Sequence, residues 1–168
     1  MQIIIPKNSN ENIFEGLVSN ENIEIVRVKC LGRFFKKFNS WSKFLMDCGC
    51  FGPAKNNVLI YAIYYSIWAG YKNIFIYGAD MTIYKNLEVN SSNEVVMRRT
   101  YFNRDDSFEV LRVGPLKNKI PSMSSMMHSA HMMFLQHEIL DSYAAYKSVN
   151  IINGSSTSQI DAYKRKLV

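Results

Sequence analysis

Three histidines are the side chains in this sequence best suited to proton transfer. His128, His131 and His137 fall within one predicted helix, and the first two are three residues apart, so they share roughly one face of it. An imidazole titrates near neutral pH and can act as a general base. Two other interpretations stay open. The pair could supply two ligands to zinc, with a third from elsewhere, or each histidine could be satisfied by a neighbouring group.

A carboxylate and an amide lie where predicted elements end and begin. Asp80 follows a β-branched and aromatic run, 73–77, that is closed by Gly78. In open α/β sheets, ligands bind beyond the carboxyl ends of the strands. Asp80 could therefore orient a ligand hydroxyl, or it could cap the next segment. Asn57 opens a predicted helix, where it could meet an anion or serve as the N-cap.

Phenol and guanidinium groups gather in a polar insert that spans residues 81–121. Tyr84, Arg98, Arg99 and Tyr101 lie in this insert, and such donors suit a phosphate that gains charge as it leaves. Long inserts after a strand are often lids or binding loops. The alternative is an exposed hairpin in which these side chains form ordinary cross-strand pairs.

The elements that must position these groups follow from hydrophobic periodicity and from turn residues. Strands are expected at 2–5, 22–29, 73–78, 87–89, 94–97 and 149–153, and helices at 33–48, 55–69, 122–147 and 158–166. Gly70 is the expected C-cap of the second helix, and Ser122 or Ser124 the expected N-cap of the third. This order predicts one α/β domain over residues 1–168. We expect a three-layer architecture with a mainly parallel sheet and a lid-like insert at 81–121.

The composition narrows the classes of partner. The chain has 168 residues and a formal net charge of +6, which favours anionic partners such as nucleotides or phospholipid surfaces, although a solvated basic surface is the simpler interpretation. No nucleic-acid-binding motif is present, and no glycine-rich phosphate loop or Gly-x-Ser-x-Gly elbow occurs. No signal peptide or membrane-length apolar run is visible, so we expect a cytoplasmic protein, with the inner-membrane surface as a possible contact.

Several segments, taken together, resemble one enzyme family. Residues 57–59 (NVL), 69–80 (AGYKNIFIYGAD), 146–153 (YKSVNIIN) and 158–165 (SQIDAYKR) resemble bacterial sialyltransferases of glycosyltransferase family 42. They also resemble the related polysaccharide-biosynthesis proteins of capsule and lipopolysaccharide loci. The resemblance covers about residues 50–166.

The resemblance implies a Rossmann-like transferase that moves a sugar from a CMP-sugar donor to a glycan acceptor, without a metal or other cofactor. It implies that His128 or His131 is the general base, and that Tyr84 assists departure of the CMP phosphate. Asn57 would lie in a turn that contacts the nucleotide. Asp80, Arg98, Arg99 and Tyr101 complete the expected substrate-binding set.

One feature of the family has no counterpart here. Its members open with a strand and a Gly-Asn-Gly-Pro-Ser-like nucleotide loop, and nothing in residues 1–30 matches that loop. The alternative expectation is therefore an inactive fragment or subunit that binds a nucleotide or another protein. A homo-oligomer, or a partner that supplies the missing N-terminal segment, is part of that expectation.

Overall fold

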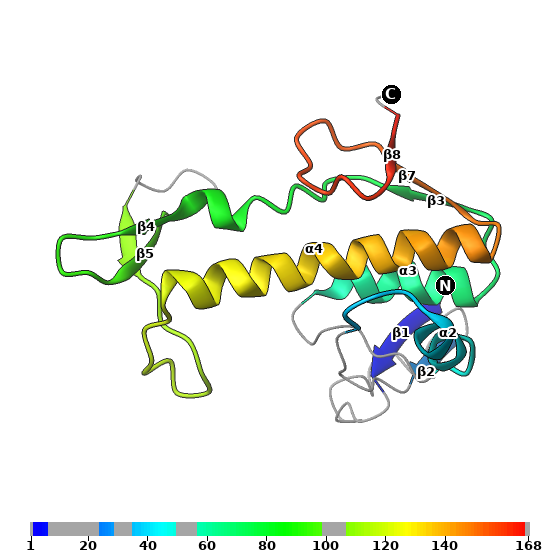
Figure 1. Ribbon diagram of the computed structural model, residues 1–168, viewed down its shortest axis with the longest axis horizontal. Helices are drawn as coiled ribbons and strands as arrows, with labels where there is room; N and C mark the ends of the chain where they lie inside the picture. The colour runs from blue at the N-terminus through cyan, green and yellow to red at the C-terminus, as the bar shows by residue number, and fades with distance from the viewer. Residues whose placement is uncertain (1, 7–23, 29–34, 50–56, 99–106, 167–168) are drawn as a thin grey trace. The chain divides into compact units, whose positions relative to one another are not determined.

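The computed structural model describes residues 2–6, 24–28, 35–49, 57–98 and 107–166 (Figure 1). It is a mixed α/β structure with a three-stranded parallel sheet, a separate three-stranded antiparallel sheet, and three α-helices among the described residues. The chain divides into two compact units, Met1–Ile74 with Ile139–Asn150, and Phe75–Glu138 with Ile151–Val168. This division does not test the prediction of a single domain over residues 1–168, which stays a prediction.

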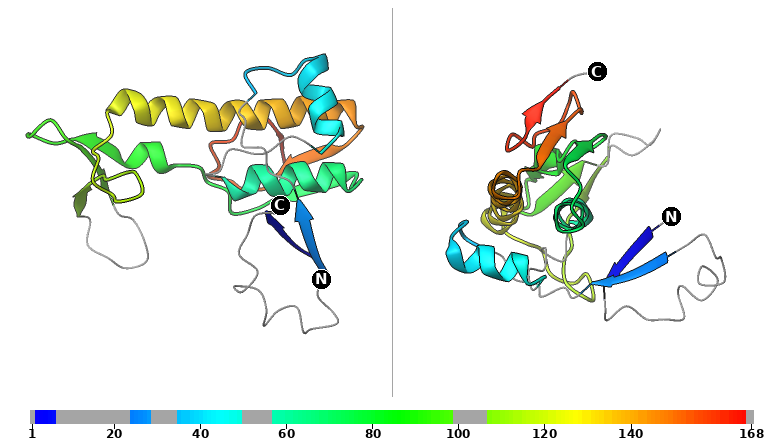
Figure 2. Two further views of the ribbon diagram at one scale, coloured as in Figure 1. Left: turned by 90° about the horizontal axis from the view of Figure 1, so that it is seen from below. Right: turned by 90° about the vertical axis from the view of Figure 1, so that its right-hand side faces the viewer.

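The first unit contains a parallel strand pair and helices packed by large apolar side chains. Its strands are β1 (Gln2–Pro6) and β2 (Glu24–Val28), and its helices are α2 (Ser40–Asp47), α3 (Val58–Trp68) and the end of α4 (Met123–Tyr146). Figure 2 shows β1 and β2 side by side. The buried core of this unit is Met46, Ile60, Ile63, Tyr64, Tyr65, Ile67, Ile139, Leu140, Tyr143, Ala144 and Val149.

The second unit carries most of the parallel sheet and the whole antiparallel sheet. The parallel sheet has the order β3 (Asn73–Ile76), β7 (Asn150–Asn153), β8 (Lys164–Arg165). The antiparallel sheet, preceded by the 3-10 helix η2 (Ile83–Asn86), has the order β4 (Leu87–Val89), β5 (Val95–Arg98), β6 (Phe108–Val110). The described parts of the predicted insert, 81–98 and 107–121, therefore contain a small sheet of their own.

Local capping chemistry explains where the helices begin and end. Ser122 caps α4, because its Oγ accepts the N–H of Ser125. Gly70 has a φ of 90° and follows α3, where the N–H of Gly70 bonds to Ile67 and the N–H of Tyr71 to Ser66. These two bonds form a Schellman motif, which satisfies the last carbonyls of the helix. The predicted ends of these two helices are confirmed to within a few residues.

One helix prediction is wrong in part, and another is wrong altogether. The helix expected at 33–48 begins only at Ser40, because Asn39 and Ser42 form a reciprocal capping box; residues 33 and 34 lie outside the described residues. The helix expected at 158–166 does not form. Residues 164–165 instead pair in parallel with β7, since side chains from Asn153 and Ser158 take the backbone groups that a helix would need.

Candidate functional site

The loops after β3 and β7 meet at the carboxyl ends of these two strands. After β3, Gly78 and Met81 both have positive φ, 67° and 54°, and this double turn presents Ala79 and Asp80. The N–H of Ala79 donates to Ser155 Oγ at 3.2 Å, and the N–H of Gln159 donates to the carbonyl of Asp80 at 2.9 Å. The structure therefore joins the Gly-x-Asp turn to a second loop, 154–159, about 75 residues further along the chain.

Side chains at this junction form what we call the edge cluster: Asp80, Tyr84, Ser155, Thr157 and Gln159. The Thr157 hydroxyl donates to the exposed Asp80 carboxylate. The Tyr84 hydroxyl donates to Gln159 Oε1 at 3.1 Å. Carboxylate, phenol, amide and hydroxyl groups can together bind the hydroxyls of a sugar or a ribose. These groups lie beyond the carboxyl end of β3, where the sequence predicts a binding site, and ligand binding there stays a prediction.

The edge cluster is built on a buried asparagine. Asn153 is fully buried at the end of β7, and its Nδ2 donates to Ser158 Oγ and to the carbonyl of Ile160 at 3.0 and 3.1 Å. Its Oδ1 accepts the N–H of Ser155 at 3.1 Å. Sequence reasoning did not single out Asn153. Its signal, a polar residue at the end of an apolar strand, is too common to be diagnostic.

Close approach of Tyr77 requires a glycine at position 154. A Cβ at position 154 would collide with the Tyr77 ring as it is placed here, unless this exposed ring moved away. Arg165 holds the other side of the same loop, donating to the carbonyls of Ser156 and Ser158. Arg165 therefore places a guanidinium beside the edge loop, a position that sequence reasoning did not assign to it.

The two candidate base histidines are exposed on α4, in the same compact unit as the edge cluster. Neither His128 nor His131 is buried. The ring of Tyr84 packs edge-on against Phe134 of α4, with 5.9 Å between the ring centroids. Because His131 and Phe134 are three residues apart on this helix, they share a face. Of the two histidines, His131 is thus the one on the helix face that Tyr84 contacts.

The third histidine is a core residue. His137 is fully buried, its Nδ1 lies 2.9 Å from the hydroxyl of Tyr163, and among the described residues nothing hydrogen-bonds to its Nε2. Burial lowers the pKa of His137 to about 4, because the charged imidazolium is poorly solvated there. His137 is therefore neutral at physiological pH and contributes to packing.

The remaining predicted site residues lie elsewhere. Asn57 is the N-cap of α3, and its Oδ1 accepts the N–H of Leu59 at 2.9 Å. Arg98 lies on β5, 4.0 Å from Glu88 and over the ring of Phe108, as in ordinary cross-strand pairing. Arg99 and Tyr101 lie outside the described residues. Within the described ranges, no three His, Cys, Asp or Glu side chains gather as a metal site would need.

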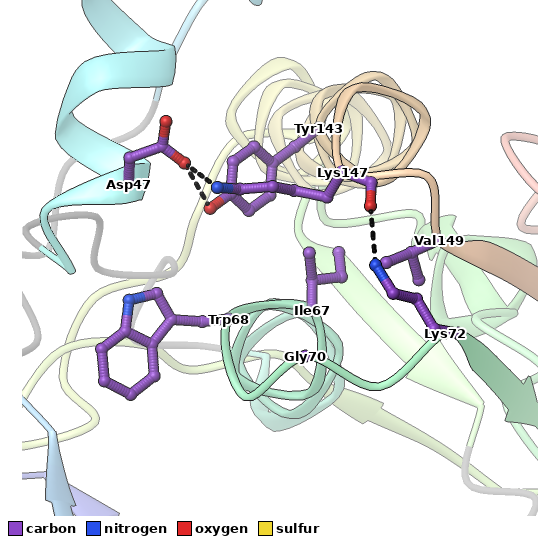
Figure 3. A pocket seen from close by; sticks show the side chains of 8 residues that line it. All are labelled: Asp47, Ile67, Trp68, Gly70, Lys72, Tyr143, Lys147 and Val149. Atoms are coloured by element: carbon purple, nitrogen blue, oxygen red, sulfur yellow. Dashed lines mark hydrogen bonds and ion pairs between the residues drawn. The ribbon is translucent and has the colours of Figure 1, made fainter.

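A pocket of about 230 Å³ lies within the first unit (Figure 3). Its lining consists of Asp47, Ile67, Trp68, Gly70, Lys72, Tyr143, Lys147 and Val149. The charged groups in it already have protein partners: Lys147 Nζ lies 2.6 Å from Asp47 Oδ1, and Lys72 Nζ donates to the carbonyl of Lys147 at 3.3 Å. Its polar groups therefore serve to join the helix ends of this unit.

The Asp47 carboxylate is the centre of this arrangement, which we call the Asp47 cluster: Asp47, Tyr143, Tyr146 and Lys147. Tyr143 and Tyr146 donate their hydroxyls to Asp47 at 3.0 and 3.4 Å. Burial raises the pKa of Asp47, but the bonds from Lys147 and the two tyrosines outweigh it, and the net pKa is below the usual value. Burial and the neighbouring Asp47 raise the pKa of Tyr143.

Comparison with known proteins found no similar protein. No protein-family model, no curated protein and no solved structure matches the chain. Among the described residues, no helix combines the length and apolar character needed to cross a membrane.

Proposed function

We propose that this chain is a sialyltransferase-like glycosyltransferase, which moves a sugar from a CMP-sugar to a glycan acceptor in surface polysaccharide synthesis. The observation that carries the proposal is the edge cluster. It combines the Gly-x-Asp turn of the family resemblance with hydroxyl-binding groups at the carboxyl end of a parallel strand. In this proposal the parallel sheet is the remnant of a Rossmann-like, three-layer domain, and residues 81–121 are its lid.

The proposed roles follow from the position of each group. His131 is the general base that deprotonates the acceptor hydroxyl, since it is exposed and shares a helix face with Phe134, the residue against which Tyr84 packs. Asp80 binds a sugar or ribose hydroxyl in place of its present partner, Thr157. Tyr84 and the guanidinium of Arg165 supply donors for the phosphate. Arg98 and Arg99, with Tyr101, are proposed to contact substrate from the lid.

The first experiment is a calorimetric titration of the full chain with CMP and with a CMP-sugar, followed by an assay of CMP release on adding a glycan acceptor. Binding of CMP together with acceptor-dependent release of CMP supports the transferase. Binding without release favours the alternative, an inactive nucleotide-binding subunit. No heat with either compound contradicts the transferase and the nucleotide-binding subunit, and leaves a subunit that binds another protein as the alternative.

The second experiment compares the two exposed histidines. His131→Ala should lower turnover by about 10² to 10⁴-fold, the usual contribution of a general base, whereas His128→Ala should change it much less. Ser124→Ala is the matched control, because Ser124 is exposed on the same helix and has no proposed role. Full activity in His131→Ala would refute the assignment of the base.

A further inference from the structure

The solvent-facing side of α2 carries two large aromatic rings. The side chains of Trp41 and Phe44 are 62% and 57% exposed, and their rings stack with 6.1 Å between centroids and 28° between planes. The opposite side of the same helix buries Ser42 and Met46. Large apolar side chains that adjoin one another in water mark interaction surfaces more often than isolated ones do.

Contacts on the inner side of α2 fix the rotation of this helix within its unit. Met46 is fully buried, and its carbonyl accepts the Tyr64 hydroxyl at 2.7 Å. Asp47 is bound to Lys147 and Tyr143. The rings of Trp41 and Phe44 cannot turn inward unless these bonds break, so the described part of this unit leaves them exposed.

Lysine residues lie near the two aromatic residues in the sequence. Lys36 and Lys37 are exposed just before α2, and Lys43 lies on the helix with its Nζ 3.7 Å from the centre of the Tyr146 ring. Asp47 is the one acidic residue in the described segment 35–49, and it is neutralised by Lys147. The exposed residues Lys36, Lys37, Trp41 and Phe44 lie close together in the sequence, and we call them the α2 surface. This segment is thus aromatic and cationic.

We propose that the α2 surface docks on the face of a bilayer that contains anionic phospholipid. Indole and phenyl rings favour the headgroup level of a membrane, and lysines beside them are drawn to anionic lipid. An eight-residue helix can lie in this interface but cannot span the bilayer. A second copy of the chain is the less suitable occupant, because two such surfaces would bring like charges together. The proposal is independent of the transferase activity.

The chain offers a site-specific fluorescence test, because it contains two tryptophans. In the full chain with Trp68→Phe, Trp41 is the sole tryptophan. Its emission should move to shorter wavelength with phosphatidylglycerol-containing vesicles and be quenched by brominated lipid. The effect should be weak with phosphatidylcholine vesicles and should fall as salt is raised. The matched control is Trp41→Phe, in which the remaining Trp68, 52% exposed in the same unit, should report no such shift.

Two double variants separate the aromatic and ionic contributions in vesicle sedimentation. Trp41→Ser with Phe44→Ser should lower the partition coefficient about tenfold or more. Lys36→Ser with Lys37→Ser should lower it about 25-fold in low salt, about fivefold for each lysine. Circular dichroism checks that both variants fold. Unchanged Trp41 emission at saturating anionic lipid, or equal sedimentation of all variants, would overturn the proposal. Concentration-dependent self-association that buries Trp41 without lipid would also overturn it, in favour of a second copy.

Discussion

Asp47 and Asp80 are the carboxylates at the centres of the two hydrogen-bond clusters, one in each compact unit. Asp47 is half-buried and binds one ammonium and two phenols. Asp80 is exposed, and its carboxylate binds the hydroxyl of Thr157. The Asp47 carboxylate is thus bonded to three protein groups, whereas the carboxylate of the exposed Asp80 is bonded to the Thr157 hydroxyl. The number of protein donors around a carboxylate thus separates a structural aspartate from a candidate ligand-binding one.

The largest expected effect comes from removing the residue that builds the edge cluster. Asn153→Ala deletes three hydrogen bonds of a fully buried amide and leaves buried partners unsatisfied. It should lower the free energy of unfolding by about 3 kcal/mol. Urea denaturation measures this. The matched control is Asn150→Ala, at an exposed asparagine of the same strand, with an expected change under about 0.5 kcal/mol. Equal losses in both variants would contradict a special role for Asn153.

The two units should lose stability in different pH ranges as the solution is acidified. The pKa of His137 is depressed from 6.5 to about 4 in the folded state, so the unfolded chain binds more protons between these values. Stability should therefore be complete above about pH 6.5 and fall toward pH 4, by about 3 kcal/mol in all. Denaturation across this range measures the slope, and His137→Phe should abolish it. A pH-independent wild type over this window would count against the buried neutral imidazole.

The Asp47 cluster should respond in a lower pH window. The pKa of Asp47 is below its ordinary value of 3.8, so its contribution to stability is present above that pH and is lost as the pH falls through the lowered pKa. At neutral pH, Asp47→Asn should cost about 1 kcal/mol, discounted for partial exposure. Asp80→Asn should change stability by less than about 0.5 kcal/mol but weaken CMP-sugar binding. Similar stability losses for the two variants would remove the distinction between these aspartates.

The smallest effect concerns backbone strain. Met81 beside Asp80 and Ser148 in the first unit both have positive φ, 54° and 53°, a conformation that favours glycine. Met81→Gly and Ser148→Gly should each raise the free energy of unfolding by about 0.5 kcal/mol. Thermal denaturation measures this gain. If the turn positions Asp80 for a ligand, only Met81→Gly should weaken CMP-sugar binding. Equal binding by both variants would show that the strain at Met81 has no functional role.

Local sequence signals predicted most elements of the fold. The strands at 2–5, 22–29 and 149–153, the hairpin and the long helix all formed close to their expected places. Apolar periodicity did not show where α2 begins, because the capping box of Asn39 and Ser42 sets the start of this helix. It also did not tell which side of α2 would face water. The third antiparallel strand, β6, carried no local pattern that separates it from loop, and the residues of β8 were expected in a helix.

The sequence by itself determined most of the helices and strands, and it determined that Gly78 and Asp80 would follow the end of a strand. These features depend on neighbouring residues, through apolar runs, capping side chains and backbone freedom at glycine. The burial of that strand was not as expected, because β3 is an edge strand in which only Ile76 is buried. Tertiary structure alone brought Thr157 to Asp80 and Gln159 to Tyr84, across 77 and 75 positions of the chain. It also buried the side chain of Asn153 within a set of hydrogen bonds and left the side chain of Trp41 exposed to solvent. Such contacts depend on the pairing of β3 with β7, and no local pattern specifies which loops the paired strands will bring together.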